Sequence, residues 1–246
     1  MPVVTIARQL GSGGGEIASL VASRLGARLL DHELLDLASA HAGIPLHYLE
    51  ALDERGRSML WRPVDLVRLV PLPPINPDLP DVTGDRYPPT GPIVARGEGL
   101  VSPAYWAMEA YATLLVRTMQ AAAAEGDTVL VGRAGNVALA DRKDALHVLI
   151  TAGAPARLRR VMAAEGLDGY NALERIQESD NKRRAYARQF FQSDWLDPQR
   201  YSLVVNTDHL SIEAAADIID GAARAMAAPS NPAVTGAPET AATAAA

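Results

Sequence analysis

The sequence predicts an α/β fold in which five parallel strands form one doubly wound sheet with helices on both faces. Three observations predict it: short apolar runs recur along the chain, helical runs separate them, and a glycine follows most of the helical runs. Parallel strands covered on both faces are apolar throughout. Alternation of strand and helix is typical of such a sheet. The 246 residues suit one domain of this kind.

The expected elements alternate in order along the chain. The expected strands are Val3–Ala7, Ala27–Leu30, Thr128–Val131, Leu146–Thr151 and Tyr201–Asn206. Helical periodicity covers residues 16–25, 31–42, 105–125, 155–165 and 211–227. Gly26, Gly43, Gly126 and Gly166 follow the first four of these helices, at the position where glycine commonly ends a helix.

Two segments depart from this alternation. Residues 62–103 are so rich in proline and glycine that neither helix nor strand can extend far, and we interpret them as an insertion over one edge of the sheet. The tail 229–246 lacks bulky side chains and is expected to be disordered. The predicted organisation is therefore one domain over residues 1–228 that carries an insertion, followed by a tail.

Composition narrows the classes of function. The net charge of −6 argues against general binding to nucleic acid, which needs clustered Lys and Arg. The absence of cysteine excludes thiolate chemistry and disulfides. No apolar run approaches the about 20 residues of a membrane span, and no signal peptide is visible at the N-terminus. The sequence predicts a cytoplasmic protein with no membrane partner, and it does not predict an oligomeric state.

A glycine loop lies between Ile6 and Ile17, where the first expected strand leads into the first expected helix. A helix N-terminus with unpaired amides binds anions, so this loop is a candidate phosphate site. Two other interpretations remain open: a tight turn without a ligand, and a dinucleotide fingerprint in which Asp31 would meet a ribose. Glu16 stands at the third glycine of that fingerprint, and the loop is longer than the fingerprint's turn. A modified phosphate loop accommodates this length better.

The usual phosphate loop carries a lysine followed by Ser or Thr, and this loop does not. When Gly13 is aligned with the second glycine of that motif, Arg8 falls at the first glycine and Gly14 at the lysine. The sequence therefore retains a backbone cradle and lacks the usual side chains.

Four ordered motifs give a specific resemblance. They are "VVTIARQLGSGGGEIASLVASRLGARLLDHELL", "VLVGRAGNVAL", "ESDNKRRAYARQFFQSDWLD" and "NTDHLS". Together they resemble the cytidylate kinase-like family over residues 3–61 and about 104–220. The resemblance implies a P-loop NTPase-like sheet and transfer of the γ-phosphoryl group of ATP to a nucleoside monophosphate, CMP or dCMP, with Mg²⁺.

The resemblance also implies roles for individual residues. Arg8, Asp31, Arg133 and Arg183 are the candidate catalytic residues: Arg133 for the acceptor phosphate, Arg183 as the lid arginine, Arg8 as a replacement for the lysine, and Asp31 for magnesium or the acceptor. The alternatives are a surface ion pair of Arg133 with Asp141 or Asp144, a pair of Arg8 with Glu16 or Glu33, and a helix cap by Asp31. The candidate nucleotide-binding residues are Gly11, Ser12, Gly13, Gly14, Gly15, Glu16, Arg157, Asp180 and Arg184.

Asp180, Arg183, Arg184 and Arg188 share one helical stripe, which is also the pattern of a solvated, ion-paired helix surface. Gly15 stands where the family usually has a second arginine, so the loop lacks one more positive charge. Glu16 would need a magnesium ion between it and ATP. The five histidines show no metal spacing, and the tryptophans Trp61, Trp106 and Trp195 are expected to pack in the interior.

Two functions therefore compete. The first is a nucleoside monophosphate kinase that uses arginines in place of the lysine. The second is a non-catalytic nucleotide-binding or regulatory protein with a degenerate loop. A nicotinamide-dependent oxidoreductase is the third and most remote alternative.

Overall fold

The computed structural model describes residues 2–50 and 103–227, with side chains from residue 110 onward in the second range. The expected insertion at 62–103 lies outside the described residues except for Pro103, which belongs to a helix. The tail, Trp61 and the side chain of Trp106 also lie outside them. The five predicted strands are all present: β1 (Val3–Arg8), β2 (Arg28–Leu30), β3 (Thr128–Val131), β4 (Ala145–Thr151) and β5 (Leu203–Asn206).

These strands form one parallel sheet in the order β2-β3-β1-β4-β5. Val3 of the central strand β1 is in register with Thr128 of β3 on one side and Ala145 of β4 on the other. The consecutive strands β3 and β4 therefore lie on opposite sides of β1. The chain changes direction at this position, and open α/β sheets bind their ligands at the carboxyl ends of the strands there.

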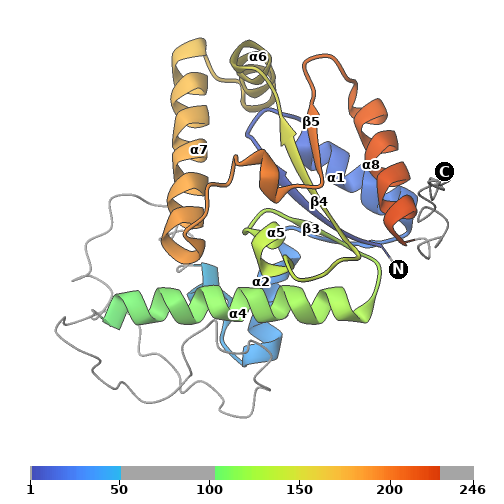
Figure 1. Ribbon diagram of the computed structural model, residues 1–246. Helices are drawn as coiled ribbons and strands as arrows, with labels where there is room; N and C mark the ends of the chain where they lie inside the picture. The colour runs from blue at the N-terminus through green and yellow to red at the C-terminus, as the bar shows by residue number, and fades with distance from the viewer. Residues whose placement is uncertain (1, 51–102, 228–246) are drawn as a thin grey trace, which may run out of the picture.

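Helices cover both faces of the sheet, as predicted (Figure 1). Helices α1 (Gly14–Leu25) and α8 (Ile212–Ala227) pack on one face, where Val4 and Ile6 are fully buried. Helices α2 (Glu33–Ala42) and α4 (Pro103–Glu125) pack on the other face, with Val3 and Leu130. Adjacent strand residues point to opposite faces, so nearly continuous apolar runs build two cores. The predicted α/β class is confirmed.

Besides a helical run at residues 46–50 and the 3-10 helix η3 (Pro198–Arg200), the described part has three further α-helices. α5 (Gly135–Ala138) is a single turn after β3 that the periodicity did not predict. α6 (Ala154–Glu165) follows β4. α7 (Gly169–Phe191) begins well before Asp180, where the charged stripe noted in the sequence starts. α6 and α7 lie side by side (Figure 1) and pack through Val161, Ala172 and Ile176 onto Leu10 of the glycine loop. This hairpin therefore brings α7 to the edge of the sheet where β1 ends.

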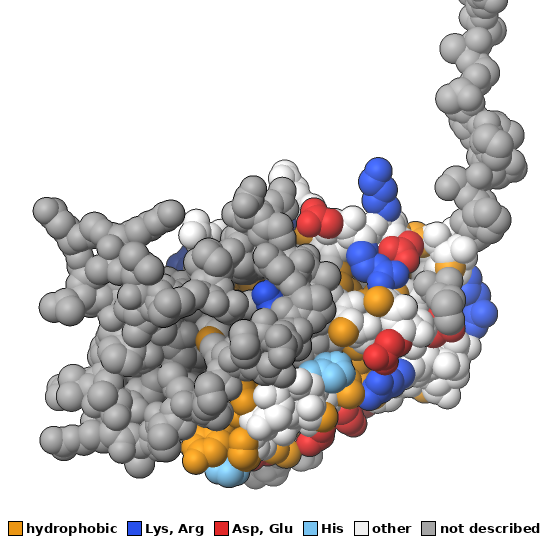
Figure 2. Space-filling view, turned by 90° about the horizontal axis from the view of Figure 1, so that it is seen from below, with side chains coloured by type: hydrophobic (Ala, Val, Ile, Leu, Met, Phe, Trp, Pro, Cys, Tyr) orange, Lys and Arg blue, Asp and Glu red, His pale blue; other side chains and the backbone are white. Residues whose placement is uncertain are grey.

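No helix among the described residues is long and apolar enough to cross a bilayer. On the face seen in Figure 2, basic and acidic side chains are interspersed, so neither sign of charge dominates that part of the surface. The expectation that the chain does not bind nucleic acid stays a prediction.

Candidate functional site

The glycine loop adopts the backbone that its composition predicts. Gly11 and Gly13 both have φ of +78°, a left-handed conformation that other residues avoid. A Cβ atom on Gly13 would lie 2.3 Å from Cδ1 of Ile212, and one on Gly11 would lie 2.7 Å from the carbonyl oxygen of Arg157. Both positions therefore favour glycine for conformation, and at Gly11 the backbone of Arg157 also leaves no space for a Cβ atom. Helix α1 begins directly after this turn, and its first amides have no partner within the helix.

Ser12 is an internal brace of the loop. Its side chain is buried, and its hydroxyl donates a hydrogen bond of 2.8 Å to the carbonyl oxygen of Gln9. Thr207, which follows β5, donates from Oγ1 to the carbonyl oxygen of Ser12 at 2.9 Å. The Ser12 hydroxyl is thus used within the protein, and the loop is fixed from two sides.

Arg160 holds the same segment. Its Nη1 donates to the carbonyl oxygen of Gly11 at 3.2 Å and to Oγ1 of Thr207 at 2.8 Å, and its Nη2 donates to the carbonyl oxygen of Thr207. Sequence reasoning missed this residue, because three arginines on one helix resemble a solvated face. For Thr207, the signal available in the sequence was the Asn-Thr motif at the end of β5.

Arg157 is a buried clamp between the loop and α7. Its Nε donates to the carbonyl oxygen of Leu10 at 2.7 Å, and its two Nη atoms pair with the two carboxylate oxygens of Asp180 at 2.8 and 2.9 Å. The side chains of Arg157 and Asp180 are only 7% and 17% exposed. All three guanidinium nitrogens of Arg157 are therefore engaged by protein groups.

Arg8 ends β1 and pairs with Asp31, which follows β2. The distance from Nη2 to Oδ2 is 2.8 Å, and both side chains are partly exposed. Neither Glu16 nor Glu33 is the partner that the structure shows for Arg8. The residue directly before α2 is His32, and the carboxylate of Asp31 faces Arg8 instead of capping that helix. Arg8 also packs against Gly14, where a Cβ would lie 2.6 Å from that of Arg8.

Arg133 lies in the turn after β3 with a left-handed φ of 48°. Its Nη1 donates to the phenolic oxygen of Tyr111 at 3.0 Å, and Tyr111 is itself buried in α4. Asp144, one of the surface partners considered for Arg133, pairs with Arg142. Strain at a non-glycine residue is common at functional sites. It is therefore compatible with the expected role of Arg133 in binding the acceptor phosphate.

Arg183 lies on α7. It donates to Ser179 Oγ at 2.6 Å, lies 3.9 Å from a carboxylate oxygen of Asp180, and stacks its guanidinium carbon 5.9 Å from the centre of the Trp195 ring. Burial, with a contribution from the positive charge of Arg8, lowers the pKa of Arg183 to about 10. Arg183 therefore stays charged at neutral pH while another cation lies close by.

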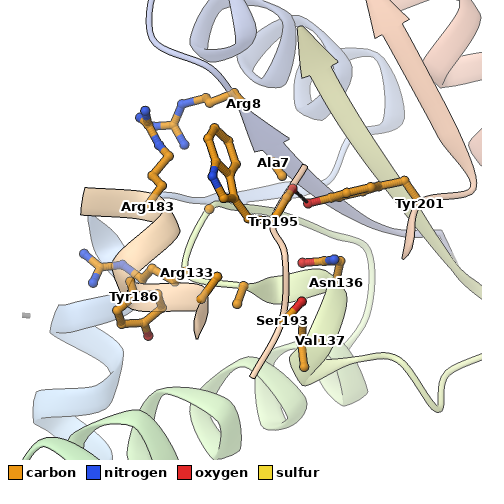
Figure 3. A pocket seen from close by; sticks show the side chains of 13 residues that line it. Ala7, Arg8, Arg133, Asn136, Val137, Arg183, Tyr186, Ser193, Trp195 and Tyr201 are labelled. Atoms are coloured by element: carbon orange, nitrogen blue, oxygen red, sulfur yellow. Dashed lines mark hydrogen bonds between the residues drawn. The ribbon is translucent and has the colours of Figure 1, made fainter. Parts of the chain in front are cut away.

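Residues from β1, from the turn after β3, from α7 and from the segment that follows α7 line a small cavity of about 70 Å³. Its lining includes Arg8, Arg133 and Arg183, and among the described residues no carboxylate lines it. In Figure 3, Arg8 and Arg183 extend toward each other, and Arg133 lies beside Tyr186. The arrangement concentrates positive charge at the carboxyl edge of the sheet, which favours an anion.

The comparisons with known proteins agree with this geometry. A family model described as the cytidylate kinase-like family matches residues 3–209. The chain belongs to the cytidylate kinase-like family. The match extends across residues 62–103, which the four motifs left outside the resemblance, and ends before the expected limit at residue 220.

A solved structure shows the same fold as this cytidylate kinase-like chain, and two others are reported beside it as weaker matches. An uncharacterized protein from Eubacterium ventriosum has a TM-score of 0.59 at 18% identity, covering 91% of this chain and 99% of that one. TT1252 from Thermus thermophilus has a TM-score of 0.46 at 19% identity, covering 93% and 99% of the two chains. Shikimate kinase from Bacteroides thetaiotaomicron has a TM-score of 0.46 at 11% identity, covering 91% and 99%. No curated protein matches the sequence significantly.

The remaining predicted residues differ in their placement. Gly15 and Glu16 are exposed in the first turn of α1, and a Cβ on Gly15 would meet nothing within 4 Å. Arg184 donates to Asn181 on its own helix and is not part of the cavity lining. Among the described residues, no group of three or more His, Asp or Glu is placed to hold a metal ion.

Proposed function

We propose that this protein is a phosphotransferase that moves the γ-phosphoryl group of ATP to a nucleoside monophosphate, with CMP or dCMP as the first acceptors to test. The observation that carries the proposal is the convergence of Arg8, Arg133 and Arg183 from three separate elements on one cavity beside the glycine loop. Phosphoryl transfer depends on positioning and on positive charge around the transferred group more than on covalent help from the protein.

Each group has a role in this proposal. The amides at the start of α1 bind the phosphates of ATP, Arg133 holds the acceptor phosphate, and Arg8 and Arg183 stabilise charge on the transferring group. An oxygen of the acceptor phosphate attacks the γ-phosphorus while the bond from that phosphorus to the β–γ bridging oxygen breaks. ADP then leaves with the bridging oxygen, and the acceptor becomes a diphosphate.

Magnesium would accompany ATP, because Mg²⁺ usually binds through one or two carboxylates, phosphate oxygens and water. The carboxylates that would hold it are Glu16, which is exposed in the first turn of α1, and Asp31, which pairs with Arg8 in this structure. The Ser12 hydroxyl is held by Gln9. When bound, the ion would neutralise charge on the phosphates. The protein groups would still provide the orientation of both substrates.

The second candidate is a nucleotide-binding protein without turnover. The engagement of Arg157 by Leu10 and Asp180, together with glycine at position 15, leaves few cations beside the loop itself. This observation favours a site that retains affinity for nucleotide and has lost catalysis.

A coupled assay of ADP formation distinguishes the two candidates. Purified protein is incubated with ATP, Mg²⁺ and each nucleoside monophosphate in turn, and the diphosphate product is identified by chromatography. Arg183→Ala should lower kcat at least about 100-fold, as removal of a group that stabilises transition-state charge does. Arg159→Ala, at an exposed position on α6, is the matched control and should retain full activity.

The competing result is equally clear. Saturable binding of ATP or CMP by calorimetry, with no diphosphate formed by the wild-type protein, would identify a nucleotide-binding protein and reject the kinase.

A further inference from the structure

Two of the residues that line the cavity of Arg8, Arg133 and Arg183 each carry a side-chain polar atom without a hydrogen-bond partner among the described residues. The two atoms are Oγ of Ser193 and Nε1 of Trp195. Both residues follow α7, line the cavity (Figure 3), and are almost completely buried, with 2% and 7% exposure. Buried polar groups are nearly always paired in native proteins, so each of these requires an explanation.

Loose local structure does not explain them. The Tyr201 hydroxyl donates to the carbonyl oxygen of Trp195 at 2.6 Å, and the Ser193 amide donates to the carbonyl oxygen of Ala187 at 3.2 Å. Arg183 lies against the face of the Trp195 ring. The segment is therefore held from its backbone and from the ring face, while the structure shows no protein partner for its two buried side-chain polar atoms.

The chemistry of the wall selects a ligand. An indole N–H can only donate a hydrogen bond, a serine hydroxyl can donate, and guanidinium groups only donate. No carboxylate among the described residues lines the cavity. A ligand that pairs with all of these groups must be negatively charged and carry several acceptor oxygens. The volume of about 70 Å³ corresponds to roughly five water molecules, which suits a phosphate group.

We propose that Ser193 and Trp195 donate hydrogen bonds to the phosphate oxygens of the acceptor, beside Arg133. The acceptor is then a phosphate monoester that this wall recognises by its phosphate rather than by its base. This inference rests on the proposed function, because that function makes the bound phosphate the acceptor. Binding of phosphate by these two residues can be tested without turnover.

The test is calorimetric titration of the full chain with orthophosphate, CMP and cytidine. Ser193→Ala removes one donor with little change in shape, and Trp195→Phe removes the other while it keeps an aromatic ring at the position that Arg183 contacts. Exposed Ser23→Ala is the matched control. Each cavity variant should weaken binding of orthophosphate and CMP about tenfold, the effect of losing one hydrogen bond to a charged group. Cytidine binding should be unchanged. The melting temperature of Ser193→Ala should not fall, because the substitution removes an unpaired buried hydroxyl.

Several outcomes overturn the inference. Wild-type affinity for CMP in both variants, an equal loss for cytidine and CMP, or no binding of either phosphate compound by the wild-type protein would each reject it. Failure of the proposed function has a different signature: orthophosphate binding that the two variants weaken, without diphosphate product in the coupled assay. In that case the phosphate wall is supported and the kinase is rejected.

Discussion

Replacement of Asp180 by Asn should destabilise the protein strongly, because it leaves Arg157 buried without a counter-charge. The pair is bidentate, with both distances below 3 Å, and Arg157 is 7% exposed. Removal of one partner of a buried ion pair typically costs about 3–5 kcal/mol. Asp180 retains 17% exposure, so we expect the lower end, about 3 kcal/mol.

Differential scanning calorimetry and urea unfolding measure this loss. For a domain of this size, 1 kcal/mol lowers the melting temperature by roughly 2–4 °C, so Asp180→Asn should melt roughly 6–12 °C lower. The exposed pair Arg175 with Glu165, at 3.3 Å, provides the control: Arg175→Ala should cost no more than about 1 kcal/mol. The double variant Arg157→Met with Asp180→Leu should recover most of the loss, because apolar side chains can replace a buried pair.

One result would refute this reasoning. If Asp180→Asn changes the free energy of unfolding by less than about 1 kcal/mol and raises the KM for ATP instead, Arg157 acts on the nucleotide rather than as a clamp. That outcome would support the sequence-based prediction that Arg157 and Asp180 bind nucleotide directly.

Two other predictions concern the loop and the sheet. Gly15→Arg adds a cation in open space at the start of α1, so it should tighten ATP binding about tenfold through one charge-assisted hydrogen bond; unchanged affinity by calorimetry would show that the side chain does not reach the phosphates. Burial lowers the pKa of His147, whose Nδ1 lies 2.8 Å from Thr5 Oγ1, below its ordinary value of 6.5. The unfolded chain therefore takes up the proton first, and the contribution of His147 to stability is complete above pH 6.5 and is lost as the pH falls through the lower folded value. Melting temperatures measured between pH 8 and pH 5 should show a smaller decrease for His147→Gln than for the wild-type protein, and equal decreases would contradict the assignment.

The strands and most of the helices could be predicted because their signals are local. Apolar runs such as Val3–Ala7 have few other stable environments than a covered sheet, and a glycine after four of the expected helices marks their ends. The four-residue helix α5 was not predicted, since it is too short to show a periodicity. The start of α7 at Gly169 was also missed, although Asp168 caps it by accepting from the Asn171 amide.

The candidate site was predictable only in part. Its position followed from the glycine loop, which comes directly after the first expected strand. The partners of its arginines did not, because a guanidinium group reaches several ångströms from the backbone and pairs with whichever acceptor the packing brings near. Arg157 and Arg160 lie on the same helix, and both hold the glycine loop rather than facing solvent.

The sequence by itself determined the class of the fold and the family, and it predicted a place for an anion, since each depends on short motifs and on patterns along the chain. Only the tertiary structure decided which groups share the cavity. Arg8, Arg133 and Arg183 come from segments far apart in the chain, and they converge because the α6 and α7 hairpin packs on Leu10. The unpaired donors of Ser193 and Trp195 likewise follow from that packing, because burial and pairing are properties of the folded chain and not of the residue type.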